Sequence, residues 1–255
     1  MSRLSRTGAM LAVASAWAAA DRLALGQAAT QPRASSHSAV TPVDRTDERW
    51  VTRNESLNAR ARKGGIDLIF LGDSITQGWE GVGKEVWAKH YAPRRALNLG
   101  ISGDRTQHVL WRLDHGNLDG LVSPDGAGPK LIVLMIGTNN SNGDDNTAAE
   151  IADGIKAIVE KLRARLPKTK ILMLAIFPRG ETPNPQRDKN AEASLLASKI
   201  GDGDMVHYLD IGARFLSPDG TLSKDIMPDG LHLSPRGYEI WAEAIDANVE
   251  ELMER

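Results

Sequence analysis

The chain has no cysteine among its 255 residues. This absence excludes disulfides, thiolate zinc sites and a cysteine nucleophile together. The chain also lacks a charge imbalance, because 31 basic and 33 acidic residues give a formal net charge of −2. Nucleic-acid-binding surfaces usually need a basic patch or stripe, so the composition does not support a nucleic-acid partner. The length suits one large α/β domain with at most a small appendage.

A long apolar run is missing as well. At the amino terminus Arg3 and Arg6 precede an apolar stretch over residues 9–20. A bilayer span needs about 20 apolar residues, so this stretch is too short to be a stable membrane anchor. A positive start, a short apolar middle and small residues after it are typical of a secretory signal peptide, which we place at residues 1–26. We therefore expect a periplasmic or extracellular protein; the alternative is a cytosolic protein with a disordered or amphipathic extension.

The stretch that follows, residues 27–45, contains Pro, Ser, Thr and Ala with hardly any large apolar residue. Such a composition buries too little apolar surface to offset the entropy lost on ordering, which predicts a disordered linker. The folded domain is then expected over residues 46–255. It begins with a polar helix that carries Trp50 and Leu57 on one side and ends at Gly64-Gly65.

Short apolar runs bounded by glycine or proline fill the rest of the domain. They are IDLIFLG, RALNLG, KLIVLMIG, KILMLAIFP and MVHYLDIG, the pattern of strands buried on both faces. Helix candidates alternate with them, over residues 84–90, 106–114, 147–166, 186–200 and 235–251. Five rounds of strand–helix alternation predict an α/β fold, a parallel sheet with helices on both faces. Ligands bind beyond the carboxyl ends of the strands in such sheets, so we expect the chemistry in the loops there.

Small polar residues occur in the loops after the first three runs. The first run ends in Gly-Asp-Ser74, the second in a loop with Gly103, and the third in Gly-Thr-Asn139. A fourth polar loop, PDGLHLS, precedes the last helix and contains Asp229 and His232. Turn chemistry explains any one of these loops taken alone. Three loops of this kind at predicted strand ends favour an active site.

A serine hydroxyl becomes a good nucleophile when an adjacent base takes its proton, and an imidazole suits that task. His232 is the candidate base because it lies in a loop, with Asp229 three residues upstream. In this hypothesis Asp229 accepts the Nδ1 hydrogen and leaves Nε2 facing Ser74. The backbone N–H groups of Ser74 and Gly103 and the side-chain amide of Asn139 are candidate donors to an oxyanion. The alternative is a simple Asp-Gly turn followed by a helix-entry histidine.

Four sequence blocks resemble those of the GDSL/SGNH hydrolases: GDSIT at Ser74, the loop at Gly103, GTNN at Asn139 and DGLH at residues 229–232. Longer segments, among them HVLWRL and PRGE-x-PNP, are similar to the catalytic subunits of platelet-activating-factor acetylhydrolase Ib and their bacterial relatives. The resemblance covers roughly residues 47–252. It implies a flavodoxin-like, three-layer α/β/α fold with a central parallel five-stranded sheet. It also implies ester hydrolysis without a cofactor or a metal.

The resemblance gives each matched residue a role: Ser74 as nucleophile, His232 as general base and acid, Asp229 as the orienting carboxylate, and Ser74, Gly103 and Asn139 as oxyanion-hole donors. Ile75 and Leu231 flank two of these residues in sequence and are expected either to shape an acyl pocket or to belong to the core. Extra length near residues 123–128 and the run at 142–145 depart from the family pattern, which leaves the substrate open. Mammalian members of that group pair as dimers, so a homodimer is a further expectation.

Three other functions fit parts of the sequence. An acyltransferase would use the same serine chemistry on an alcohol acceptor, and a catalytically silent carbohydrate-binding module is disfavoured because every catalytic position is intact. The stretch GWEGVGK fits P-loop spacing, but Glu85 stands where a serine or threonine should bind Mg²⁺. The sequence therefore predicts a serine esterase for short acyl esters, above all acetyl esters, of a small molecule or polysaccharide. An acetylated carbohydrate is the first expectation and a lipid the second.

Overall fold

The structure is a computed structural model that describes residues 36–122, 126 and 128–254. The expected signal peptide at residues 1–26 and most of the expected linker lie outside the described residues, so the predicted export stays a prediction. Most of the segment at residues 123–128, where the sequence departs from the family pattern, also lies outside the described residues. Among the described residues, no helix is long and apolar enough to cross a bilayer.

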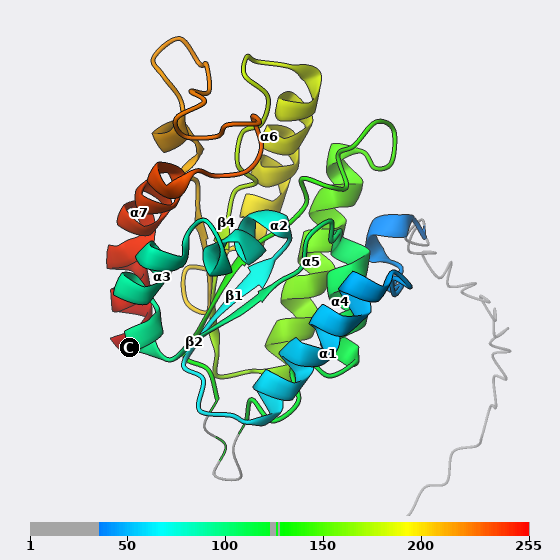
Figure 1. Ribbon diagram of the computed structural model, residues 1–255. Helices are drawn as coiled ribbons and strands as arrows, with labels where there is room; N and C mark the ends of the chain where they lie inside the picture. The colour runs from blue at the N-terminus through cyan, green and yellow to red at the C-terminus, as the bar shows by residue number, and fades with distance from the viewer. Residues whose placement is uncertain (1–35, 123–125, 127, 255) are drawn as a thin grey trace, which may run out of the picture. The chain divides into compact units, whose positions relative to one another are not determined.

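A parallel five-stranded sheet forms the centre of the domain (Figure 1). Its strands are β1 (Leu68–Gly72), β2 (Ala96–Gly100), β3 (Leu131–Met135), β4 (Lys170–Leu174) and β5 (Val206–Leu209). They lie in the order β2-β1-β3-β4-β5, and each neighbouring pair is parallel. The chain therefore moves outward from β1 to β2 and then crosses to the other side of β1. In doubly wound sheets such a switch point, here between β1 and β3, is where ligands bind.

One face of the sheet is covered by four helices: α1 (Glu48–Arg62), α4 (Thr106–Asp114), α5 (Ala148–Arg165) and α6 (Pro185–Ala197). Alternate strand residues reach this face, as Ile69 and Leu71 of β1 do, because successive side chains of a strand point to opposite sides. Trp50 and Leu57 of α1 are buried in this layer, as the sequence predicted. These four helices pack against strand side chains that belong to the apolar runs of the sequence.

The other face carries α2 (Ser74–Gln77), α3 (Lys84–His90) and α7 (Pro235–Glu254) (Figure 1). An aromatic cluster fills this layer, in which the Phe70 ring lies 5.9 Å from that of Trp79 and 6.0 Å from that of Trp241. The buried Tyr238 hydroxyl donates to the carbonyl of Ile75 at 2.7 Å. This bond links α7, which follows His232, to α2. The two layers and the sheet confirm the predicted three-layer α/β/α fold.

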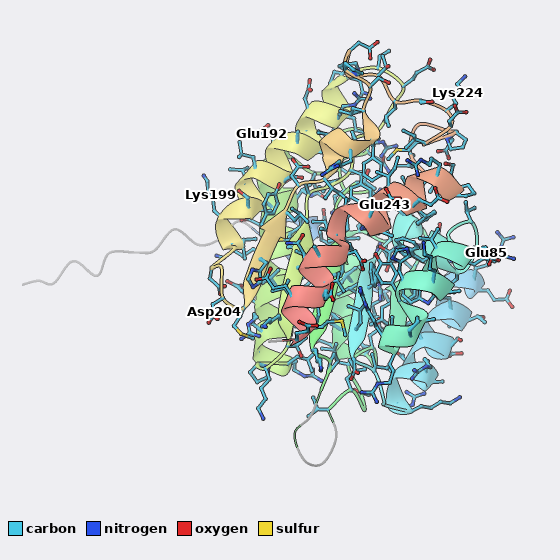
Figure 2. The ribbon with its side chains drawn as sticks, turned by 90° about the vertical axis from the view of Figure 1, so that its left-hand side faces the viewer. Glu85, Glu192, Lys199, Asp204, Lys224 and Glu243 are labelled. Carbon is cyan, nitrogen blue, oxygen red and sulfur yellow. The ribbon has the colours of Figure 1, made fainter. Side chains whose placement is uncertain are left out.

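Charged side chains lie on the outer surfaces of these layers. Figure 2 shows them projecting from the ribbon, with six labelled: Glu85, Glu192, Lys199, Asp204, Lys224 and Glu243. All six are exposed. These six come from several elements and include both signs, in line with the near balance of charge in the composition.

The helix limits follow local capping chemistry. The helices predicted at residues 84–90 and 106–114 are found with those bounds. α5 begins at Ala148 because Thr147 caps it, in a box where Thr147 Oγ1 accepts from the Glu150 N–H and Glu150 accepts from the Thr147 N–H. The predicted helix at 186–200 is α6 followed by a 3₁₀ turn over Ser198–Ile200.

The predicted start of the domain is wrong by about ten residues. Residues 36–45 belong to the folded unit rather than to a linker, and Ser38–Val40 form a 3₁₀ turn. Ala39 is fully buried, and its carbonyl accepts a hydrogen bond from the buried Thr106 hydroxyl at 2.8 Å. The composition predicted a linker here because the contacts with α4 are made by small residues and backbone groups, which carry little apolar surface.

Candidate active site

Ser74 lies at the carboxyl end of β1, as the first residue of α2. The turn into this short helix depends on Gly72, where an added Cβ would meet the Thr76 hydroxyl at 2.2 Å and the Met135 carbonyl at 2.4 Å. Asp73 then caps α2, because its Oδ1 accepts from the Ile75 N–H at 3.0 Å. A strand that ends in glycine and a capping aspartate therefore presents the serine at the edge of the sheet.

His232 and Asp229 reach Ser74 from a loop more than 150 residues later in the chain. Ser74 Oγ lies 2.9 Å from His232 Nε2, and His232 Nδ1 lies 2.7 Å from Asp229 Oδ2. The other oxygen of Asp229 accepts the backbone N–H groups of Leu231 at 3.0 Å and His232 at 2.7 Å. The carboxylate thus fixes both the ring and the backbone of the histidine.

The protonation pattern follows from these contacts. Partial burial alone would raise the pKa of Asp229, but the hydrogen bonds from the His232 side chain and from the two backbone N–H groups outweigh burial and lower the pKa. An ionised Asp229 takes the Nδ1 hydrogen, which leaves Nε2 as the acceptor for the Ser74 hydroxyl. In this tautomer the hydroxyl can lose its proton to His232 as it attacks a carbonyl carbon.

Gly103 and Asn139 lie in the loops after β2 and β3, at the same carboxyl end of the parallel sheet as Ser74. Asn139 Nδ2 donates one hydrogen to the carbonyl of Asp104 at 2.9 Å, which leaves its second hydrogen for a ligand. Gly103 has a φ of +78°, a conformation that glycine adopts without strain. Within the described part of the chain, the N–H groups of Ser74 and Gly103 have no hydrogen-bond partner. The three predicted oxyanion donors therefore each have an uncommitted hydrogen.

A buried ion pair that the sequence analysis missed supports this loop. Arg112 and Asp104 are both fully buried, and Arg112 Nε lies 2.7 Å from Asp104 Oδ2. Arg112 Nη2 also donates to the Gly72 carbonyl at 3.0 Å, two residues before Ser74. The Trp50 ring N–H donates to the other Asp104 oxygen at 2.7 Å. Burial raises the pKa of Asp104, and the contacts with Arg112 and Trp50 oppose that rise.

Arg112 therefore joins the residue next to Gly103 to the strand end that carries the serine. One signal in the sequence could have revealed it. Arg112 lies three residues after Val109, at a spacing that places both on one helix face, and that face also carries Leu113. A charged residue at a core position of an amphipathic helix needs a buried partner.

Comparisons with known proteins agree with this geometry. A family model described as the GDSL-like lipase/acylhydrolase family matches residues 70–240. The chain belongs to this family. It is 37% identical over 231 residues to the human platelet-activating factor acetylhydrolase IB subunit alpha2, a match that covers 90% of this chain and 95% of the relative. The human alpha1 subunit is 38% identical over 201 residues, covering 78% and 82%. The predicted resemblance is confirmed, and this GDSL-like acylhydrolase is a carboxylic ester hydrolase.

Solved structures share the fold at lower sequence identity. A putative platelet activating factor structure from Streptococcus pneumonia superposes with a TM-score of 0.63 at 24% identity, covering 79% of this chain and 95% of that one. Est24, a carbohydrate acetylesterase from Sinorhizobium meliloti, superposes with a TM-score of 0.56 at 21% identity, covering 73% and 99%. At these identities the likeness concerns the fold alone, and it supports the α/β/α architecture of the acylhydrolase.

The two residues expected at the acyl pocket differ in exposure. Ile75 is only 1% exposed and belongs to the core layer that contains α7, while Leu231 is partly buried against the same layer. Both are bulky and apolar, and each is the neighbour in sequence of a residue in the Ser74–His232 pair. That they limit the acyl group of this acylhydrolase stays a prediction.

Beside the serine of the acylhydrolase lies an unusual carboxyl group. Asp73 is fully buried, and its Oδ2 has no hydrogen-bond partner in the described part of the chain. Burial raises the pKa of Asp73 to about 7; the Ile75 N–H and His232 oppose the rise, and the charge of Asp104 adds to it. At acidic pH the group is therefore neutral in the folded protein. Near neutral pH it changes charge next to Ser74.

Stability is expected to depend on this carboxyl. An unfolded aspartate ionises near pH 3.9, so from about pH 4 to 7 the folded protein keeps a proton that the unfolded chain has lost. The native state is favoured at the low end of this window, and the advantage is lost as the pH rises to about 7. Asp73→Asn has no such proton. We expect the unfolding free energy of the wild type to fall by about 3 kcal/mol relative to Asp73→Asn between pH 5 and 8.

Urea denaturation of both proteins at several pH values measures this difference, and groups common to both cancel. A gap between the two unfolding free energies that stays constant from pH 5 to 8 would show that Asp73 titrates normally.

Proposed function

We propose that this acylhydrolase is a serine esterase that removes short acyl groups, with acetyl the preferred one, through an acyl-enzyme. The observation that carries the proposal is the unbroken chain of contacts from Ser74 Oγ to His232 Nε2 at 2.9 Å and from His232 Nδ1 to Asp229 at 2.7 Å. This constellation of hydroxyl, imidazole and carboxylate is the one that activates a serine on many unrelated folds.

In the first half-reaction Ser74 Oγ attacks the ester carbonyl carbon while His232 Nε2 takes the hydroxyl proton. The carbonyl oxygen becomes an oxyanion that accepts from the N–H groups of Ser74 and Gly103 and from Asn139 Nδ2. Loss of one such donor typically costs about 10²–10³ in turnover. Collapse of the intermediate breaks the bond to the alcohol, which leaves with the proton from His232.

In the second half-reaction a water molecule attacks the acyl-serine. His232 Nε2 takes a proton from the water, and the same three donors hold the second oxyanion. The bond to Ser74 Oγ then breaks, the serine regains its proton from His232, and the carboxylic acid leaves. Asp229 stays ionised throughout and stabilises the imidazolium that forms in each half.

One observation and one prediction support acetyl as the acyl group. The curated relatives at 37–38% identity are named as acetylhydrolases, and Est24 among the solved structures is described as a carbohydrate acetylesterase. The predicted pocket role of Ile75 and Leu231, which adjoin Ser74 and His232 in the sequence, would favour a small acyl group as well. For a protein exported by a signal peptide at residues 1–26, the expected substrate is an acetylated carbohydrate, in which a sugar hydroxyl is the alcohol part. A lipid ester is the second choice.

A panel of 4-nitrophenyl esters of increasing chain length, followed by acetylated sugars, tests the proposal. We expect kcat/KM to fall at least about tenfold from acetyl to hexanoyl, because each added methylene that does not fit costs one to two powers of ten. Acetate release from acetylated sugars should follow. Turnover that rises with chain length, with no acetate released from any sugar, would refute the acetyl preference. A large excess of transfer over hydrolysis when an alcohol acceptor is supplied would favour an acyltransferase.

A further inference from the structure

Residues 179–180 lie between the loop that carries Asn139 and the loop that carries His232. From one side, Arg179 Nη1 donates to the Thr138 carbonyl and hydroxyl at 3.2 Å each, and to Asn142 Oδ1 at 3.3 Å. Thr138 is the residue before Asn139. On the other side, the Gly180 N–H donates to the Gly230 carbonyl at 2.6 Å. Arg179-Gly180, here called the bracket, therefore touches both loops.

The contact with the histidine loop is close as well as polar. Gly230 has a φ of +71°, and an added Cβ there would lie 3.3 Å from the Gly180 Cα. Gly230 stands between Asp229 and His232 in the chain, so Gly180 packs directly against the backbone that carries both. The bracket is thus in position to set the distance between the base and the oxyanion donor.

Arg187 of α6 holds the bracket itself. The residue is only 8% exposed. All three guanidinium nitrogens donate to main-chain carbonyls. Nε donates to the Arg179 carbonyl at 3.0 Å, Nη1 to the Gly220 carbonyl at 2.6 Å, and Nη2 to the Gly180 carbonyl. Among the described residues no carboxylate lies within ion-pair distance of it, although the charge of Asp188 favours its ionised form. A nearly buried cation is costly, and here three backbone carbonyls, two of them in the bracket, receive its hydrogen bonds.

We propose that Arg187 is a positioning residue for catalysis: through the bracket it fixes His232 relative to Ser74 and Asn139. The inference rests on the proposed esterase function and adds a residue to it. Displacement of a catalytic group by about 1 Å can cost about 10²-fold in rate. A lysine at position 187 keeps the charge but has one nitrogen, so it cannot hold three carbonyls in a fixed plane.

The chain supplies a matched control in Arg163 of α5. Its guanidinium also donates to three carbonyls, those of Leu166 at 3.3 Å, Pro167 at 2.7 Å and Thr169 at 2.7 Å. These carbonyls precede β4, at the end of the parallel sheet opposite to the loops with Ser74 and His232. Arg163→Lys therefore removes the same kind of contact without touching the bracket.

The test compares Arg187→Lys with Arg163→Lys on 4-nitrophenyl acetate, with active sites counted by titration with a serine-directed phosphonate. We expect kcat per titrated site to fall about 10- to 100-fold in Arg187→Lys while KM changes less than about threefold. Arg163→Lys should keep the wild-type kcat per site. Wild-type kcat per site in Arg187→Lys, with only fewer titratable sites, would reduce Arg187 to a structural residue and overturn the inference. Arg187→Met, if it folds, should show a larger loss of the same kind.

A spectroscopic readout separates this inference from the proposed function, because it needs no turnover. In histidine-labelled protein, Ser74→Ala should shift the Nε2 resonance of His232, since the two side chains are 2.9 Å apart. We expect that shift to shrink in the Arg187→Lys background and to stay unchanged in the Arg163→Lys background. A shift of full size in Arg187→Lys would contradict the inference even if the protein proved to be no esterase. A reduced shift in a protein without any ester turnover would support the positioning role of Arg187 and refute the proposed esterase function.

Discussion

Replacing Ser74 with alanine is expected to lower the kcat for ester hydrolysis about 10⁴- to 10⁶-fold. The residual rate would come from the oxyanion donors and from substrate binding, which still act without a nucleophile. The fold should be unaffected, because the Ser74 side chain is only partly buried and its contact is with the His232 ring at the edge of the sheet. Alanine is also a good residue for the first turn of α2.

Initial rates on 4-nitrophenyl acetate measure this loss, and urea denaturation checks that the free energy of unfolding changes by no more than about 0.5 kcal/mol. Ser198→Ala is a suitable control, since Ser198 lies in the 3₁₀ turn after α6 and its hydroxyl donates to the Leu195 carbonyl of the preceding helix. The control should keep full activity. A folded Ser74→Ala protein that retains even a tenth of the wild-type kcat would rule out Ser74 as the nucleophile.

The largest effect on stability is expected at Arg112. Arg112→Met removes one partner of a fully buried ion pair, and the nearest cation that Asp104 keeps is Arg45 at 3.6 Å. The Gly72 carbonyl keeps only the Ile101 N–H as donor, and Asn117 Oδ1 loses its donor. Breaking a buried pair by removing one member typically costs about 3–5 kcal/mol, because the remaining charge stays desolvated. We expect a loss of that size in the free energy of unfolding.

Equilibrium urea denaturation gives the measurement, and the exposed pair of Arg236 and Glu239 gives the control. Arg236→Met should leave the free energy of unfolding nearly unchanged, since exposed pairs contribute little. Asp104→Asn should also destabilise, though it keeps an acceptor for the Trp50 ring N–H. A loss below about 1 kcal/mol in Arg112→Met would mean that the pair contributes no more than a surface contact.

Much of the fold is predictable because its signals are local. Five apolar runs bounded by glycine or proline give five buried strands, and caps such as Thr147 define the helix ends. The strand order could not be read from the residues themselves, because pairing depends on contacts between distant segments. The family resemblance implied a flavodoxin-like sheet, and the structure supplies the order β2-β1-β3-β4-β5. The error at residues 36–45 has the same origin, since the Ala39–Thr106 bond that orders this segment joins positions 67 apart.

The candidate site also contains residues that the sequence predicts and residues that it does not. Ser74, Asp229 and His232 were predictable because their chemistry is unusual in loops at strand ends, and the structure brings all three into contact. The residues that support them were not found. For Arg112 the sequence holds only an indirect signal, its place on an apolar helix face, and for Arg187 we find none; both roles become clear only when burial is known. An arginine in a helix is usually exposed, so residue type alone does not identify a buried one.

The measurement that tests the central claim most directly is the identification of the acylated residue during turnover. The wild type, quenched in acid while it hydrolyses 4-nitrophenyl acetate, should be digested and its peptides weighed by mass spectrometry. The account predicts one acetyl group, on the peptide that contains Ser74 and at Ser74 itself, and none on that peptide in Ser74→Ala. An acetyl group on another residue, or a stoichiometric burst of nitrophenol with the Ser74 peptide unmodified, would contradict it.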